Sequence, residues 1–422
     1  MPSSPSIPKP EFFKNDLIAG VWKVEGELGS GGCGVVYQVS AEFTDKKTNK
    51  KKLIFAAMKA ETVDIEGSYG ETLNAEVIQS LLTALFVLQV VVLRRMQWSE
   101  YVCRLYVGGR LAPTINIMVM SMVGRPLSWV RKQCPDQKFT LSTAVRIGIQ
   151  CLHAIQHLHS IGYLHRDVKA SNYALGTYPD GLRNVHLLDF GFARSYVKEF
   201  KNGFMKHRKA RKKAPFLGTR RYCSINAHMK LEQGRRDDLW SFLYMIVEMI
   251  DGTLPWRACK TTEIIDVKRS AMDTLLNNCP REIRTLLDHL LTLEYESAPD
   301  YVLFDESLES VCKRKKFNGA DPYDWENGGL AHENFIAQSQ KSPPLKYLKQ
   351  RSVRDPGDDP PSDSDRTCCK KKSDCTCSFR EKADSEGRSE VRTAKRFKKK
   401  DFDLLDKLRK QNKYPPGNVK TE

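Results

Sequence analysis

The hydrophobic positions change their period part-way along the chain. From Val21 to about Lys59 they alternate as strands do, in VVYQV and LIFAAMKA, with a Lys/Thr/Asn-rich loop between them. After a helical stretch come the strand-like YVCRLYVGG and INIMVMSMV, and beyond Ser128 long helical periods dominate, as in TAVRIGIQCLHAIQHLHSIG and DDLWSFLYMIVEMIDG. A strand-rich first part and a helix-rich second part predict an α+β fold with two lobes and a cleft between them.

Polar segments bound this two-lobed domain. Residues 1–17 are rich in Ser and Pro, and residues 341–422 are polar and low in aliphatic side chains, so both are expected to be disordered. The domain is predicted over 18–330, with an N-lobe at about 18–121 and a C-lobe at about 124–330. The apolar run 81–93 is shorter than the roughly 20 residues that a membrane span needs, and no membrane association is expected.

Net charge and cysteine usage indicate the class of partner and the cellular compartment of the protein. The formal net charge is +17, which attracts anions such as nucleic acid, acidic membranes or acidic and phosphorylated proteins. The basic runs 207–213 and 395–400 match no RNA- or DNA-binding motif that interleaves aromatic with basic side chains, and they hold the single aromatic residue Phe397, so nucleic acid is the least favoured of these partners. Scattered cysteines without an apolar leader indicate reduced thiols in an intracellular protein, cytoplasmic or nuclear. The tail run CC-x5-C-x-C fits no usual zinc pattern. A monomer is expected.

A glycine-rich loop is the first candidate for binding chemistry. Gly29, Gly31 and Gly34 form G-x-G-x-x-G-x-V with Val36, between two predicted strands. Glycines let backbone N–H groups approach phosphates closely. A dinucleotide-binding motif requires a helix after the third glycine, and a strand-like segment follows instead. Taken alone, the motif could equally be a hairpin turn.

Two further motifs supply the groups that phosphoryl transfer needs. Asp167, Lys169 and Asn172 lie on one predicted loop, as HRDVKASN, and provide a carboxylate for the hydroxyl proton, a cation and an amide oxygen. Asp189, in DFG, follows a predicted strand and suits Mg²⁺ held against phosphates. Lys59 ends the strand AAMK and is the candidate that grips the α- and β-phosphates of ATP.

In this order the motifs resemble those of the eukaryotic protein kinases over about residues 18–330. The segments LHRDVKASNYALG, LLDFGFARSYV, GTRRYCSINAH and GRRDDLWSFLYMIVEMIDGTLPWR resemble the casein kinase 1 group and, within it, the tau-tubulin kinase-like branch. Ser224-Ile-Asn226 stands where most kinases have Ala-Pro-Glu. The resemblance implies a bilobal kinase fold, ATP and Mg²⁺ as cofactors, and protein substrates.

The resemblance also assigns roles to single residues. Asp167 is the implied catalytic base, Lys169 the phosphate-facing cation that marks a Ser/Thr kinase, and Asn172 and Asp189 the Mg²⁺ ligands. Lys59 is expected to contact ATP phosphates and to pair with Glu76. The implied nucleotide pocket comprises the glycine loop with Leu28, Val36 and Ala57, the gatekeeper Met120, and the hinge 121–123 with Met122.

The segment after DFG predicts how the kinase is controlled. Between Tyr196 and Thr219 there is no Ser, Thr or Tyr, so phosphorylation in that interval cannot activate the protein, and it is expected to be active as synthesised. Arg166 and Arg221 are expected to share an anion site. With the basic run 207–213 they favour acidic or already phosphorylated substrates, although this run could also be a solvated loop.

One segment departs from the family pattern. Removing residues 77–89 from LNAEVIQSLLTALFVLQVVVLRRM restores LNAEVVVLRRM, an uninterrupted match. The thirteen residues are either a real insert, which adds roughly 20 Å of helix, or an unspliced intron, since their ends are compatible with splice sites. If a real insert displaces Glu76, a catalytically silent kinase-fold scaffold is the alternative function.

Overall fold

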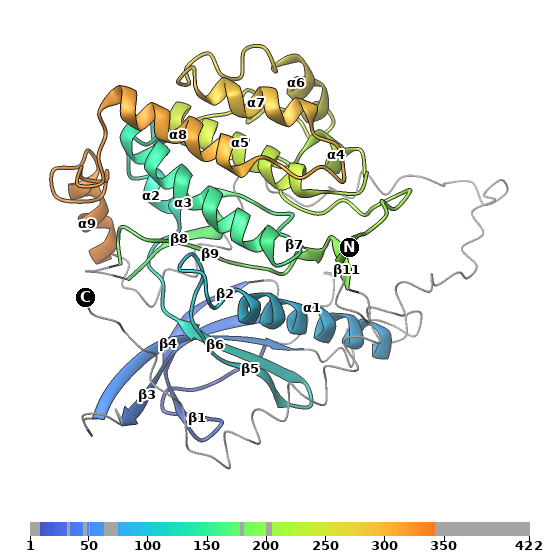
Figure 1. The fold of residues 1–422 in the computed structure, drawn as a ribbon. Coiled ribbons are helices and arrows are strands. Elements are labelled where there is room, and N and C mark those ends of the chain that lie inside the picture. Colours follow the sequence, from blue (N-terminus) through green and yellow to red (C-terminus); the bar gives the residue numbers. More distant parts are fainter. Residues whose placement is uncertain are drawn as a thin grey trace.

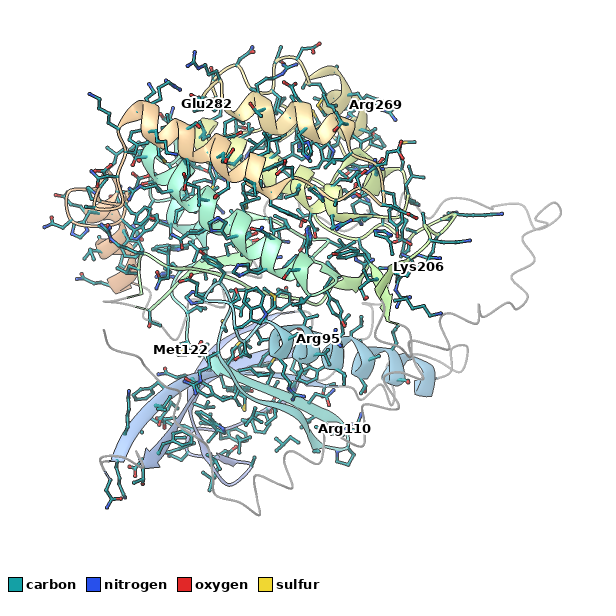
Figure 2. The ribbon with its side chains drawn as sticks, in the orientation of Figure 1. Arg95, Arg110, Met122, Lys206, Arg269 and Glu282 are labelled. Atoms are coloured by element: carbon teal, nitrogen blue, oxygen red, sulfur yellow. The ribbon has the colours of Figure 1, made fainter. Side chains whose placement is uncertain are left out.

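The protein forms two lobes, as the sequence predicted. The computed structural model describes residues 9–31, 34–44, 49, 51–62, 75–177, 181–199 and 205–341. A curved antiparallel sheet with one long helix makes the N-lobe, and a mainly helical C-lobe packs beside it (Figure 1). The chain passes from the N-lobe to the C-lobe through the segment that contains Met122 (Figure 2). The tail beyond residue 341, including its cysteines and its basic run, lies outside the described residues.

The N-lobe sheet has six strands in the order β1-β2-β3-β4-β6-β5. Their bounds are β1 Leu17–Ile18, β2 Trp22–Gly31, β3 Gly34–Thr44, β4 Lys51–Thr62, β5 Leu105–Ala112 and β6 Ile115–Ser121. Because side chains alternate between the faces of a strand, every second residue of β3, β4 and β6 points to the same side. The register places Lys59 opposite both Val36 and Met118, so these three side chains share one face.

The opposite face of the sheet has its own small core. Trp22, Val39 and Met58 are fully buried there, with Ile117 and Val119. The first described residues cover this core: the Tyr37 hydroxyl donates to the carbonyl of Pro10 (2.8 Å), and the ring of Phe12 meets the ring of Tyr37 edge to face. The prediction of disorder through residue 17 is therefore wrong for residues 9–17, because aromatic packing holds them against the sheet.

Helix α1 (Ala75–Arg95) lies between the sheet and the C-lobe (Figure 1). Its C-terminal part is well packed: Phe86, Val90 and Leu93 are buried at helical spacing, whereas Leu81 and Leu85 are exposed. Val90 is so close to Gly108 of β5 that a Cβ on the glycine would lie 2.8 Å from Val90 Cγ1. The packing of α1 is thus fixed by residues that follow the first turns of the inserted segment.

The C-lobe is built around α3 (Leu141–Ser160) and α5 (Arg235–Asp251), which pack on each other. The other elements are α2 Leu127–Arg131, η1 Pro135–Gln137, η2 Ala170–Asn172, α4 Ile225–His228, α6 Ile264–Ser270, α7 Ile283–Thr292, α8 Tyr301–Lys315, α9 His332–Lys341, β7 Tyr163–Leu164, β8 Tyr173–Leu175, β9 Val185–Leu187, β10 Arg194–Ser195, β11 Val197–Glu199 and β12 Met205–His207. Three short pairs, β8-β9, β7-β10 and β11-β12, lie on the side that faces the N-lobe (Figure 1).

Two expectations from composition can be compared with this fold. Within the described ranges, no helix is both long and apolar enough to cross a membrane, and the run 81–93 is part of α1. The seven cysteines of the described part of the chain are all free thiols, and four of them are buried in the core: Cys103, Cys134, Cys151 and Cys223.

Candidate active site

The loop between β7 and η2 is anchored by Asp238, from the first turn of α5. Its carboxylate accepts the backbone N–H groups of His165 and Arg166, both at 2.7 Å, and contacts His159 Nε2 at 2.9 Å. Burial alone raises the pKa of Asp238, but the hydrogen bonds from His159 and His165 hold it below its ordinary value. These bonds also hold Arg166 at φ 64°, a left-handed conformation that non-glycine residues seldom adopt.

His165 connects this loop to the DFG segment. Its Nδ1 accepts the N–H of Asp167 (3.3 Å), so its Nε2 carries the proton and donates to the carbonyl of Leu188 (3.1 Å). The imidazole also packs on the ring of Phe190, with centroids 5.7 Å apart. The two loops that carry Asp167 and Asp189 are therefore held together by one fully buried histidine.

The carboxylate of Asp167 is the centre of a polar cluster. Lys169 Nζ lies 3.0 Å from Asp167 Oδ2, and the Thr219 hydroxyl donates to Asp167 Oδ1 (2.8 Å) while it accepts from Lys169 (2.7 Å). Gly218 allows this close approach: its φ is +108°, and a Cβ there would lie 2.6 Å from the carbonyl oxygen of Arg166. The cluster brings together a proton acceptor, a cation and a hydroxyl-bearing side chain at one point.

The residues expected to hold Mg²⁺ fit that role chemically. The hydrogen bonds that Asn172 donates, to the backbone carbonyl (2.8 Å) and the carboxylate (3.2 Å) of Asp167, both use Nδ2, so its Oδ1 can bind a cation. Asp189 is exposed, has φ 64°, and accepts the N–H of Gly191 at 3.4 Å. An amide oxygen and a carboxylate are hard oxygen ligands that suit Mg²⁺. The ion would supply charge neutralisation at the phosphates of ATP.

The predicted nucleotide pocket lies on the cleft side of the sheet. Ala57 is opposite Met120 on β6, and Val36 is opposite Lys59. Leu28 is buried, and Gly29 and Gly31 pair with Val36 and Gly34 respectively, while residues 32 and 33 at the loop tip lie outside the described residues. Gly34 has φ +144°, and a Cβ there would lie 2.1 Å from the carbonyl of Ala60. The strand that follows the glycines is β3, as the sequence predicted.

Lys59 has two contacts that the sequence did not predict. Its Nζ donates to Gln89 Oε1 (2.9 Å) and lies 2.6 Å from Glu61 Oε1. Glu76 is on the same continuous helix as Gln89, but thirteen residues earlier, which corresponds to about 20 Å along the axis. The Glu76 side chain lies outside the described residues, so its predicted pairing is not observed. Gln89 takes the place on α1 that faces Lys59.

The two arginines of the predicted anion site are in different surroundings. Arg166 donates through Nε to the carbonyl of Phe192 (2.7 Å), and burial together with the nearby charges of Arg194 and Arg211 lowers its pKa to about 10. Arg221 instead has a side chain only 3% exposed and is paired with the buried Glu248 at 3.7 Å. Its place in a surface anion site is therefore corrected, because its charge is directed into the C-lobe core.

The segment after Thr219 is fixed by interactions that the sequence did not reveal. The buried ammonium of Lys268 donates to the carbonyls of Arg220 (2.9 Å) and Cys223 (2.6 Å), and burial lowers the pKa of Lys268 to about 8. Ser224 and Asn226, the group marker, both donate to Asp237 Oδ1, at 2.6 and 3.1 Å. The group marker therefore has a structural role: it attaches this segment to the start of α5.

Sequence reasoning did not anticipate four residues that contact the predicted site: Glu61, Gln89, Thr219 and Asp238. A signal existed for two of them, since Glu61 is two positions after Lys59 on a strand, and Thr219 follows the glycine of GTRRY. The contacts of Gln89 and Asp238 depend on how distant elements pack, which no local pattern reports.

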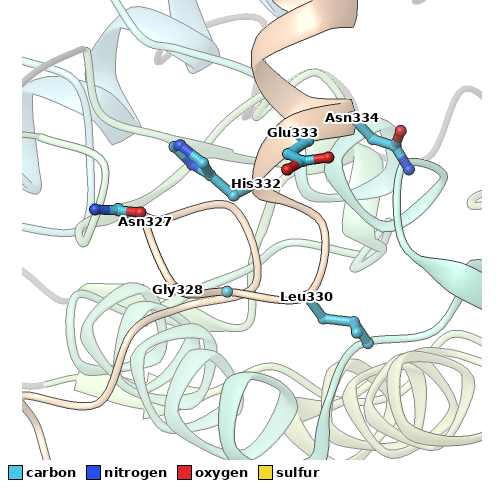
Figure 3. Close-up of a pocket in the computed structure, with 7 residues that line it drawn as sticks. Asn327, Gly328, Leu330, His332, Glu333 and Asn334 are labelled. Atoms are coloured by element: carbon cyan, nitrogen blue, oxygen red, sulfur yellow. The ribbon is translucent and has the colours of Figure 1, made fainter.

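A pocket lies at the loop before α9, distant in sequence from the residues described above. Asn327, Gly328, Leu330 and His332 line it, with Glu333 and Asn334 at its rim (Figure 3). It is open to solvent and presents no group of titratable side chains directed at one point. Across the described ranges, no cluster of three or more His, Cys, Asp or Glu is arranged to hold a metal ion.

Sequence comparison with known proteins supports the fold and the site described above. The sequence matches the protein kinase domain over residues 22–300, which is more than half of the chain. The chain belongs to the protein kinase family. The kinase domain explains the curved sheet, the helical lobe and the catalytic loop between them, and the names of the relatives place the chain with the Ser/Thr protein kinases, which are phosphotransferases.

Three relatives illustrate the similarity. A Dictyostelium discoideum protein named as a probable serine/threonine-protein kinase is 35% identical over 317 residues, which are 75% of this chain and 58% of that protein. A Caenorhabditis elegans protein named as a candidate casein kinase I is 31% identical over 326 residues, 76% of this chain and 88% of its own. An inactive tau-tubulin kinase of C. elegans is 34% identical over 230 residues, 50% of this chain and 76% of its own. The chain thus spans less than two thirds of the Dictyostelium protein.

Proposed function

We propose that the protein is an active Ser/Thr kinase that transfers the γ-phosphoryl group of ATP to protein hydroxyls, with Mg²⁺. The observation that carries this proposal is the cluster at Asp167, where a carboxylate, the ammonium of Lys169 and the Thr219 hydroxyl are hydrogen-bonded to one another. A substrate hydroxyl that replaces Thr219 at Asp167 would find a proton acceptor and an adjacent cation. Asn172 and Asp189 would hold the metal ion.

We propose further that activity does not need phosphorylation of the activation segment. Residues 197–218 contain no Ser, Thr or Tyr. The segment is supported by internal contacts instead: Lys268 holds the carbonyls of residues 220 and 223, and Arg211 forms a two-point ion pair with Glu232. Glu232 also lies 3.6 Å from Arg194. Its carboxylate supplies negative charge among the arginines, where other kinases could use a phosphate.

The same arginines support a preference for acidic or phosphorylated substrates. Arg166, Arg194 and Arg211 gather around the carboxylate of Glu232, with Asp238 also acting on Arg166. Guanidinium groups bind phosphate and carboxylate through paired hydrogen bonds. This proposal places the preference at Arg194 and Arg211 and leaves Arg221 out. It also agrees with membership of the casein kinase 1 group and its tau-tubulin kinase-like branch, which we propose on the motifs quoted above.

A silent kinase-fold scaffold is the second candidate, and one observation favours it. Among the α1 side chains that the structure describes, the amide of Gln89 accepts a hydrogen bond from Lys59, at a point where the kinase pattern has a carboxylate. An inactive relative exists among the similar proteins. Such a scaffold would bind nucleotide or partner proteins and transfer no phosphate.

One assay separates these functions. Purified protein is incubated with ATP, Mg²⁺ and an acidic protein substrate, and phosphate incorporation is compared with that of Asp167→Asn. Loss of a general base lowers the rate by about 10²- to 10⁴-fold, whereas the control Asp266→Asn changes an 81% exposed carboxylate and keeps wild-type activity. Wild-type protein that binds ATP but incorporates no phosphate would support the scaffold.

The substrate preference has its own test. Paired peptides with and without an upstream phosphoserine are compared as substrates for wild-type protein and for Arg194→Gln/Arg211→Gln. We expect the double variant to lose the preference through a higher KM for the phosphorylated peptide. The exposed Lys313→Gln is the control. An undiminished preference in the double variant contradicts the assignment.

A further inference from the structure

The ammonium of Lys59 has a carboxylate partner on its own strand. Lys59 and Glu61 are separated by one residue in β4, so both side chains point to the cleft side of the sheet. Glu61 Oε1 lies 2.6 Å from Lys59 Nζ, and the side chains are only 10% and 20% exposed. Because water is largely excluded, this pair interacts more strongly than ion pairs on the surface.

The helix offers Lys59 a different kind of contact. Gln89 Oε1 accepts a hydrogen bond from Nζ at 2.9 Å, and the Gln89 residue is 6% exposed. Glu61 Oε1 lies within ion-pair distance of the same ammonium. Gln89 therefore supplies a directed but uncharged acceptor, and Glu61 supplies the negative charge.

The position of Gln89 is fixed by packing on both sides of it in the helix. Phe86, Val90 and Leu93 are buried in the large core, and Val90 lies against Gly108 of β5. Thr83 adds a hydrogen bond from Arg110 (3.1 Å). A residue at position 89 cannot move away from Lys59 without breaking these contacts. The inserted segment has thus left an amide at the point where the kinase pattern calls for a carboxylate.

We propose that Glu61 is the positioning carboxylate of Lys59 in this chain, and that Gln89 completes the site as a neutral acceptor. Glu61 holds the ammonium so that it faces the phosphates of ATP. It does not touch the nucleotide itself. The proposal rests on the proposed function, because Lys59 needs this orientation only if ATP binds in the cleft.

The test uses the full-length protein and two measurements: the dissociation constant of a fluorescent ATP analogue, and the kcat and KM for ATP. Glu61→Gln keeps the size of the side chain and removes its charge. We expect about tenfold weaker nucleotide binding, as for loss of one charge-assisted interaction, and a lower kcat. Glu61→Gln/Gln89→Glu returns a carboxylate to the same ammonium from the helix, and we expect it to restore binding to within about threefold of wild type.

The rescue separates a positioning role from a merely structural one. If Glu61 only supported the fold, a glutamate at position 89 would not restore nucleotide affinity, and that result overturns the proposal. The matched control is Glu42→Gln, which removes the carboxylate of an exposed lysine pair, Lys51–Glu42, on neighbouring strands of the same sheet. We expect that control to bind nucleotide as wild type does.

A second variant covers the case in which Glu61→Gln does not fold. Glu61→Asp keeps the charge and withdraws it by one methylene, and about threefold weaker binding is expected; unchanged affinity contradicts the proposal. Failure of the proposed function looks different: nucleotide affinity depends on Glu61, but wild-type protein transfers no phosphate. Normal phosphate transfer that is insensitive to Glu61→Gln refutes this inference alone.

Discussion

Asp167 and Lys59 belong to opposite lobes, and they obtain their partners in different ways. The partners of Asp167 include Lys169 and Asn172, two and five residues later in the same loop. The helix partner of Lys59 is Gln89, thirty residues later and on another element. The first arrangement survives changes elsewhere in the chain because its spacing is local. The second depends on helix register, so a change in helix length between positions 76 and 89 would change which side chain meets Lys59.

The difference also shows in how each region is held. The loop that carries Asp167 is anchored by Asp238 of α5, a buried carboxylate with three hydrogen-bonding partners. The contacts of Lys59 include a hydrogen bond and an ion pair that come from two separate elements. We therefore expect substitutions in the C-lobe site to affect the fold and the chemistry together, and substitutions around Lys59 to affect chiefly nucleotide binding.

The largest effect is expected at Asp238. Asp238→Ala leaves the N–H groups of His165 and Arg166 without their acceptor and removes the partner of His159. Breaking a buried charged network of this kind costs about 3–5 kcal/mol, measured as the loss of unfolding free energy in urea. The control Asp266→Ala removes an exposed carboxylate at the start of α6. A loss below about 1 kcal/mol would show that the loop is not anchored by α5.

A smaller effect is expected at Thr219, and it falls on the rate rather than on stability. Thr219→Val keeps the shape of the side chain but removes the hydroxyl between Asp167 and Lys169. We expect kcat to fall about 10- to 100-fold, equivalent to about 1.4–2.7 kcal/mol, with little change in the midpoint of thermal unfolding. Thr219→Ser retains the hydroxyl and should retain most activity. Equal rates for the Val and Ser variants would contradict this role.

The sequence predicted most of the C-lobe site because its residues carry their chemistry in fixed spacings. Asp167, Lys169 and Asn172 meet as expected, since the residues between them form a single tight loop. The two-lobed fold was also predicted, from a change in hydrophobic period. The same local signals placed the glycine loop before β3 and Lys59 on β4.

The predictions that failed all concern contacts between distant segments. Arg221 appears available to anions in the sequence, but its side chain is 3% exposed and lies 3.7 Å from the buried Glu248 of α5. Residues 9–17 look disordered by composition, yet the hydroxyl of Tyr37 holds Pro10 against the sheet. The expected pairing of Lys59 with Glu76 stays a prediction, because the Glu76 side chain lies outside the described residues. No periodicity in the sequence encodes these pairings.

The pH dependence of the unfolding free energy tests whether the buried Lys268 supports the segment after Thr219. Its pKa is lowered by burial to about 8 from an ordinary 10.5, so between these values the unfolded chain binds a proton that the folded chain does not. The contribution of Lys268 to the unfolding free energy therefore increases as the pH rises from about 8 to 10.5. Lys268→Met lacks this slope, so the gap in unfolding free energy between the two proteins should move in favour of wild type by about 1 kcal/mol from pH 8 to pH 9.

The exposed Lys313→Met is the control for that experiment, because the side chain of Lys313 is 77% exposed. Parallel pH profiles for wild type and Lys268→Met would mean that the ammonium is not desolvated, and the segment after Thr219 would then need another support.

The smallest effect is expected from removing residues 77–89. This deletion tests whether the register of α1 decides which side chain meets Lys59. The shortened helix keeps Val90, Leu93 and Met96 on the core, and Glu76 takes the place of Gln89. With a carboxylate returned to that place, Glu61→Gln should weaken nucleotide binding less than about threefold, against about tenfold in the full chain, a difference of about 0.7 kcal/mol. An equal penalty in both backgrounds would mean that the helix does not set the partner of Lys59. A smaller loss of affinity would mean that the register of α1 decides which helix side chain reaches Lys59. The insert would then change this partner and leave the other contacts of the kinase site unaltered.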